Sequence, residues 1–171
     1  MINRSLIPQH TFNLCNYSDA VGIAHDMKKL QIKEYVYMFS TALMTLKYGS
    51  SKDNEWKRKG IYGERIYRQA HHIPGWLNGC AGPLTSGYDF REILTHCPTL
   101  TKNDIIITVW DMSNYPFLAA NKPKEVEEFE NELIHNFKNL HGRRPIGNPK
   151  DMSYASNVTV VSDLVFNHIF S

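Results

Sequence analysis

The chain has 171 residues, a length that suits one domain with one hydrophobic core. Hydrophobic residues make up 42% and charged residues 21%, which excludes an intrinsically disordered protein, and the net charge of +2 identifies no partner. No apolar run approaches the roughly 18 residues of a membrane span, and the N-terminus lacks a secretory signal pattern. We therefore expect no membrane partner and a cytoplasmic location, in the host cytoplasm if a virus encodes the chain.

The N-terminal part of the chain predicts an extension followed by a β-hairpin. Residues 1–33 are interpreted as an N-terminal extension that contains a short helix over 19–30. The run at 34–39 alternates apolar and polar residues, as a half-buried strand does, and the run at 43–48 predicts its hairpin partner.

The middle of the chain predicts a helix and a buried strand separated by loops. A polar loop over 50–61 precedes a helix over 63–73, and a glycine-rich loop over 77–90 precedes a short helix over 90–96. The continuous apolar run at 104–110 is typical of a central strand.

The C-terminal part predicts the longest helix, over 122–141, which Gly142 ends. Residues 149–171 are interpreted as a C-terminal extension with a strand over 157–161. The order of elements predicts an α+β fold, in which a small mixed sheet opens with a β-hairpin and is flanked by helices. We expect a single domain, with its core over 34–148.

The cysteines and the clustered positive charges are candidate binding groups. Three widely spaced cysteines without metal-ligand spacing favour free thiols over a zinc site or disulfides. Cations with nearby tyrosines and tryptophans suit a nucleic-acid backbone, although such runs are more often a solvated face. They form two groups: Lys47, Lys52, Lys57, Arg58, Lys59, Arg65 and Arg68, and then Arg143 and Arg144.

One glutamate of the 122–141 helix falls among apolar residues. Glu130 lies four residues after Val126 and four before Ile134, so helical periodicity turns it toward the apolar stripe. An unpaired buried carboxylate is costly, and such a group normally has a cation, hydrogen bonds or a metal. A buried salt bridge and a metal ligand both stay open as interpretations.

The 63–73 helix carries a polar flank suited to a phosphate. Arg65, Gln69 and His72 lie along one side, whereas Arg68 points the other way. A guanidinium can bind phosphate oxygens and an imidazole can transfer a proton. An ordinary polar helix border is the alternative.

These parts, in this order, resemble the GIY-YIG nuclease family. Tyr-Val-Tyr at 35–37 resembles the GIY motif, and Lys-Tyr-Gly at 47–49 resembles YIG with a lysine in place of its tyrosine. Gly-Glu-Arg-Ile at 63–66 is similar to the arginine helix, and Glu-Asn-Glu-Leu-Ile at 130–134 is similar to the glutamate helix. The segment at 143–148 resembles the closing motif and ends in its asparagine.

The resemblance implies a DNA endonuclease that uses one Mg²⁺ or Mn²⁺ ion per active site. Glu130 would hold the metal, Tyr37 would be the general base and Lys47 would favour its ionisation. Arg65 would stabilise the phosphate, and Asn148 would brace the site. Cutting both strands would need a second protomer or a second visit, so a homodimer is a candidate assembly.

Two further positions of the family pattern have counterparts here. Gly49 aligns with the YIG glycine, and a side chain of the arginine helix would position the water. The position four residues after Arg65 is Gln69 rather than His or Tyr, so Gln69 or His72 would take that role. Arg58, with Tyr62 four residues later, is an alternative to Arg65 as the catalytic arginine. The candidate DNA-contacting cations are Lys52, Lys57, Arg58, Arg68, Arg143 and Arg144.

Other functions stay open beside this interpretation. Tyr37 alone is most simply a packed strand tyrosine, and Lys47 an exposed residue that protects a sheet edge. The same scaffold could be a non-catalytic DNA-binding module. It could also be a protein-interaction module, such as an inhibitor, whose basic surface faces an acidic partner.

Overall fold

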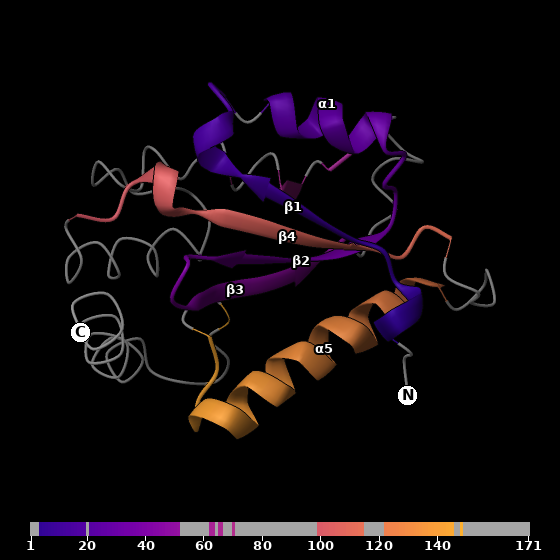
Figure 1. Cartoon of the computed structure of the whole chain (residues 1–171). Coiled ribbons are helices and arrows are strands. Elements are labelled where there is room, and N and C mark those ends of the chain that lie inside the picture. The colour runs from indigo at the N-terminus through magenta and orange to yellow at the C-terminus, as the bar shows by residue number, and fades with distance from the viewer. Residues whose placement is uncertain are drawn as a thin grey trace.

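The computed structural model describes residues 4–19, 21–51, 62–63, 65–66, 70, 99–114, 122–145 and 148. Within them, four strands form one sheet, which confirms the α+β class (Figure 1). The strands lie in the order β1 (Gln9–Asn13), β4 (Ile106–Asp111), β2 (Tyr35–Ser40) and β3 (Thr45–Ser50). β3 is therefore an edge strand, and β2 and β4 are central.

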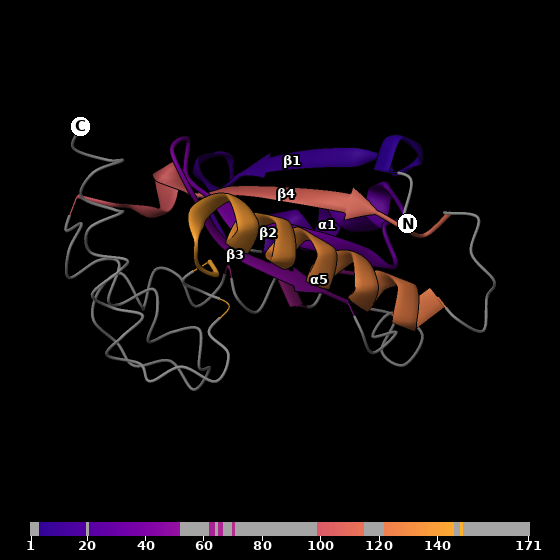
Figure 2. The same cartoon turned by 90° about the horizontal axis from the view of Figure 1, so that it is seen from below.

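Helices cover both faces of this sheet (Figures 1 and 2). Helix α1 (Val21–Lys29) lies on one face, and helix α5 (Lys122–His141) packs against β2 and β3 on the other. Short 3-10 turns at Arg4–Leu6, Leu14–Asn16 and Lys102–Asp104 adjoin the strands. We call these two faces the α1 face and the α5 face.

Strand alternation gives each face its own hydrophobic cluster. Tyr35, Tyr37 and Phe39 of β2 belong to the cluster that also contains Ile23 and Met27 of α1. The intervening residues of β2 and a stripe of α5 form the other cluster, whose buried members include Val36, Val126, Phe129, Leu133, Ile134 and Phe137. Each strand residue can therefore be assigned to a face by its position.

The N-terminal segment, which the sequence predicted to be an extension, contributes strand β1 to the sheet. β1 pairs with β4, and Phe12 opposite Ile107 joins the cluster on the α1 face. Every pairing between described strands is antiparallel, whereas a mixed sheet was expected. The reason is the position of β4: it lies between β1 and β2, which run in the same direction but do not pair with each other.

The hairpin and the long helix agree closely with the sequence. β2 and β3 pair in the expected antiparallel arrangement, with a bulge between Phe39 and Ser40. α5 has the predicted bounds, and Gly142 ends it with a φ of 72° in the left-handed region, where glycine is unstrained. Leu140, expected on the apolar stripe, is 81% exposed in the last turn of the helix.

Helix α1 is tied to the segment before it by a hydrogen bond. The Tyr17 hydroxyl donates to Asp26 Oδ2 at 2.8 Å. Burial raises the pKa of Tyr17 to about 12, helped by this hydrogen bond and by the charge of Asp26. The neutral phenol is therefore the form that the folded state prefers.

We predict that this phenol makes the protein less stable to unfolding above pH 10. An unfolded tyrosine loses its proton near pH 10 and the folded Tyr17 near 12, so its contribution is complete below pH 10 and disappears between pH 10 and 12. Tyr17→Phe should cost about 1 kcal/mol at pH 8, the usual worth of one hydrogen bond. Urea unfolding at pH 8 to 12 should show the two proteins converging, and parallel pH profiles would contradict this assignment.

Candidate functional site

Four consecutive residues of the edge strand β3 include or contact five of the eight predicted catalytic and supporting residues. Lys47 is itself one of them. Tyr48 is bonded by Asn148, Gly49 lies under the ring of Tyr37, and Ser50 is bonded by Glu130; these three contacts come from different segments of the chain. The candidate site therefore lies along residues 47–50 of β3.

Tyr37 and Gly49 fit together as a side chain and the space that it needs. The two residues are directly paired across β2 and β3. A Cβ atom added to Gly49 would overlap the Cζ and hydroxyl atoms of Tyr37, so the phenol lies over this glycine. The phenol is directed toward β3, beyond which no described strand pairs. Tyr37 is 1% exposed, and its ring also contacts those of Tyr35 and Phe39.

The two predicted cations of the core motif lie on the same face as Tyr37. Lys47 pairs with Phe39, and alternation along β3 places it on the same side as Gly49. Arg65 is helical and half-buried, and the next residue, Ile66, is buried in the cluster that contains Tyr37. The α1 face thus carries a phenol and two positive charges.

Glu130 approaches β3 from the α5 face. It is only 8% exposed, in accordance with its position on the apolar side of α5. The Ser50 hydroxyl donates a hydrogen bond to its Oε2 atom. Ser50 is 2% exposed and pairs with Val36, which belongs to the α5-face cluster. The carboxylate is therefore held at the end of β3 by a neutral hydroxyl.

The phenol and the carboxylate thus meet adjacent residues of one strand from opposite faces. Gly49 receives Tyr37 on the α1 face, and Ser50 receives Glu130 on the α5 face. Consecutive Cα atoms are about 3.8 Å apart, so the two contacts are close along the strand. Within the part of the chain that the structure describes, no strand pairs with the outer side of β3, which lies next to both contacts.

Asn148 closes part of this edge with its side-chain amide. Its Oδ1 accepts from the Tyr48 backbone N–H at 2.7 Å, and its Nδ2 donates to the Tyr48 carbonyl at 2.8 Å. These are the two hydrogen bonds that a neighbouring strand would make. Arg144 Nε donates to the Asn148 carbonyl at 2.8 Å, so the two residues are also bonded to each other. These contacts are those of a bracing residue.

Tyr48 lies beside the site but is unsuited to act as a base. Its ring belongs to the α5-face cluster and lies near Trp110, with ring centroids 6.5 Å apart. Burial raises the pKa of Tyr48, against smaller opposite effects of a hydrogen bond with Thr45 and the charge of Arg4. The phenol is accordingly neutral at physiological pH.

The oxygen atoms at the end of β3 fit a hard divalent ion bound together with substrate. Mg²⁺ prefers oxygen ligands and is commonly held by one or two carboxylates plus phosphate oxygens. Glu130 supplies a carboxylate, and substrate phosphate oxygens would supply further ligands. Among the residues that the structure describes, no group of three or more His, Cys, Asp or Glu side chains could hold a metal without substrate.

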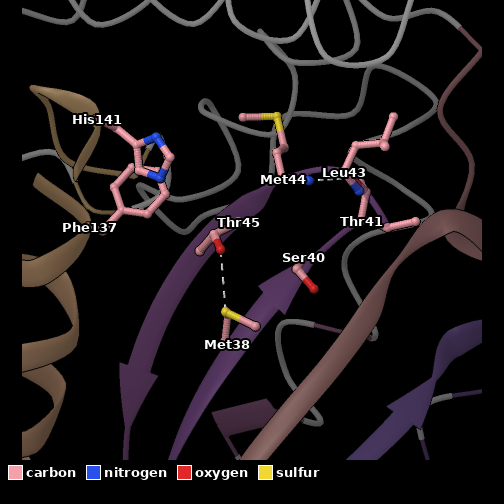
Figure 3. Close-up of a pocket in the computed structure, with 9 residues that line it drawn as sticks. Met38, Ser40, Thr41, Leu43, Met44, Thr45, Phe137 and His141 are labelled. Atoms are coloured by element: carbon pink, nitrogen blue, oxygen red, sulfur yellow. Dashed lines mark hydrogen bonds between the residues drawn. The ribbon is translucent and has the colours of Figure 1, made fainter.

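A separate hollow of about 300 Å³ lies between the hairpin turn and the end of α5 (Figure 3). Residues 41–45 line one side, and Phe137 and His141 line the other, with ring centroids 4.2 Å apart. On the hairpin side, Thr45 donates a hydrogen bond to the Met38 sulfur of the neighbouring strand. None of the predicted site residues lines this hollow.

Several predicted residues lie outside the described part of the chain. Arg143 and Arg144 are described, and both are half-buried. Tyr62, named with Arg58 as an alternative pair, packs against the α1-face cluster. Outside the described residues are His72, Gln69, Arg68, Lys52, Lys57, Arg58 and Lys59.

Sequence reasoning did not identify Ser50. The signal was present: in strand β3 this serine has the same parity as Tyr48, on the side that packs against α5. A serine at such an apolar position needs a hydrogen-bond partner. Glu130 was singled out for the same reason, and the two polar residues are each other's partners.

Comparisons with family models, with curated proteins and with solved structures find no match for this chain. No helix in the described ranges combines the length and the apolar composition that crossing a membrane requires. What is said of function below therefore depends on the residues themselves.

We predict that Gly49→Ala destabilises the protein by about 1–3 kcal/mol, the usual cost of overpacking. The φ angle of Gly49 is outside the left-handed region, so the cost comes from the overlap with Tyr37. In a Tyr37→Leu background, which lacks the outer phenol atoms, the same substitution should cost much less. Urea unfolding of the four proteins measures the coupling, and additive effects would show that the phenol does not lie over Gly49.

Proposed function

We propose that this protein is a divalent-metal-dependent DNA endonuclease that hydrolyses phosphodiester bonds. The observation that carries the proposal is the meeting of Tyr37 and Glu130 with adjacent residues of the edge strand β3. A phenol and a buried carboxylate, distant in the chain, thus contact neighbouring residues of one strand from opposite faces, and we propose that a backbone phosphate lies along that strand.

The arrangement of the chain supports the resemblance to GIY-YIG nucleases as a proposal. The hairpin β2–β3, which contains the two tripeptides, is followed in the chain by Arg65, by strand β4 and then by helix α5, which carries Glu130. The YIG-like glycine accommodates the GIY-like tyrosine, which gives the two motifs a physical reason to occur together. The closing asparagine, Asn148, is bonded to the same hairpin.

In this proposal each residue has a defined task. Glu130 would hold the metal, whose positive charge would supply electrostatic stabilisation to the reacting phosphate. Tyr37 accepts a proton from the attacking water, and Lys47 and Arg65, on the same face, favour the phenolate and bind phosphate oxygens. Asn148 maintains the shape of the edge. His72 or Gln69 would orient the water.

The proposed substrate follows from charge. Arg143 and Arg144 precede the Asn148 clamp by a few residues, and Arg144 is bonded to the Asn148 carbonyl beside β3. Guanidinium groups at this position suit a polyanionic backbone, and such binding weakens as salt is added.

A second candidate function, non-catalytic DNA binding on the same scaffold, is favoured by one observation. Tyr37 is 1% exposed, which suits a packed tyrosine, whereas a general base must be reached by water. This alternative keeps the cations of the β3 edge but predicts no metal-dependent cleavage.

We predict that Glu130→Gln reduces plasmid nicking in Mg²⁺ or Mn²⁺ by at least about 100-fold, because the metal contributes several kcal/mol to such reactions. EDTA should have the same effect on the wild type. DNA binding in metal-free buffer, measured by fluorescence anisotropy, should not change.

The matched control is Glu128→Gln, which removes the same charge from the same helix. Glu128 is exposed, and its 3.9 Å ion pair with Lys124 is a surface pair of little energetic value. This variant should nick DNA as the wild type does. If wild-type protein binds DNA but never nicks it in either metal, the non-catalytic function replaces this proposal.

A further inference from the structure

The hydrogen bond between Ser50 and Glu130 joins β3 to α5 beside apolar side chains of both elements. Val36 lies opposite Ser50 in the sheet, and Val126, Phe129 and Ile134 surround Glu130 on α5. All three of these α5 residues are at most 5% exposed. Packing on every side limits the rotamers of the glutamate, and the serine hydroxyl then fixes which way its carboxylate turns.

A hydroxyl at this place does more than satisfy a buried group. The side chain of Ser50 reaches the acid on the α5 face, while the residue before it receives the phenol of Tyr37 on the α1 face. One strand segment thus sets the position of the carboxylate relative to the phenol. A ligand carboxylate held by an outer hydrogen bond generally binds metal more tightly than one left to rotate.

We infer that Ser50 is a positioning residue for the metal-binding carboxylate of Glu130. This inference rests on the proposed function, and it adds a residue that the family resemblance did not supply. Ser50 acts through Glu130: it holds Oε2 so that the carboxylate is presented at the end of β3 at a fixed angle.

The chain offers a matched control in the next residue. Ser51 is also buried, at 3% exposure, but its hydroxyl donates to the Lys33 carbonyl at 3.3 Å and is not bonded to Glu130. Ser50→Ala and Ser51→Ala therefore remove the same atom from neighbouring buried positions. Only the first should alter the binding of a metal.

The test measures Mn²⁺ binding to the full chain in complex with a short non-hydrolysable DNA duplex, by electron paramagnetic resonance of the free ion, after subtraction of the Mn²⁺ that the duplex binds alone. Ser50→Ala should weaken binding by about 10- to 100-fold, and Ser51→Ala should leave it unchanged. Ser50→Thr, which keeps the hydroxyl, should recover most of the affinity. Thermal melting checks that each variant is folded, and Ser50→Cys, closer in size with a weaker donor, replaces the alanine variant if that one unfolds.

Nicking as a function of Mg²⁺ concentration separates this inference from the proposed function. If the wild type nicks DNA but Ser50→Ala binds Mn²⁺ as well as the wild type does, the role of Ser50 is refuted and the nuclease stands. If the wild type binds Mn²⁺ in a Ser50-dependent way but never nicks, the nuclease is refuted and the role of Ser50 stands. A wild type that binds no Mn²⁺ overturns the inference.

Discussion

A carboxylate enclosed by hydrocarbon is the constraint from which the account of this protein follows. Glu130 lies between β3 and the apolar stripe of α5, where an unpaired charge would cost several kcal/mol. Its bond with Ser50 compensates part of that cost and fixes the helix against the end of the strand. An aliphatic residue would fill this position without needing a hydrogen-bond partner, which is one reason for our proposal that the acid holds a metal.

The edge position of β3 gives that task a geometry. Because β3 has no strand beyond it among the described residues, groups from both faces can approach a ligand at its outer side. Gly49 allows the phenol of Tyr37 to lie over the strand, and Asn148 makes at Tyr48 the two hydrogen bonds of a neighbouring strand. Among the described residues, no strand covers the rest of this edge.

The elements with strong local signals were predicted well from the sequence. Helix α5 has the expected bounds, and its stripe placed Glu130 in the interior correctly. The hairpin was also correct, displaced by one or two residues. In these segments the periodicity of side chains reports directly on which face is buried.

What the sequence could not provide depends on contacts between distant segments. The pairing of β1 with β4 joins residues that are far apart in the sequence, such as Phe12 and Ile107, so no local pattern predicts it. The same holds for the partner of Glu130: a buried acid predicts that some polar group is near but not which one. That Tyr37 and Glu130 occupy opposite faces follows only from the register of β2 and β3.

The most direct test of the central claim is a crystal structure of the protein soaked in Mn²⁺, with anomalous data to locate the ion. The account predicts an anomalous peak within coordination distance of the Glu130 carboxylate, at the edge of β3, with Ser50 still bonded to its other oxygen. A Glu130 fully engaged by a cationic side chain, with no peak nearby, would contradict it.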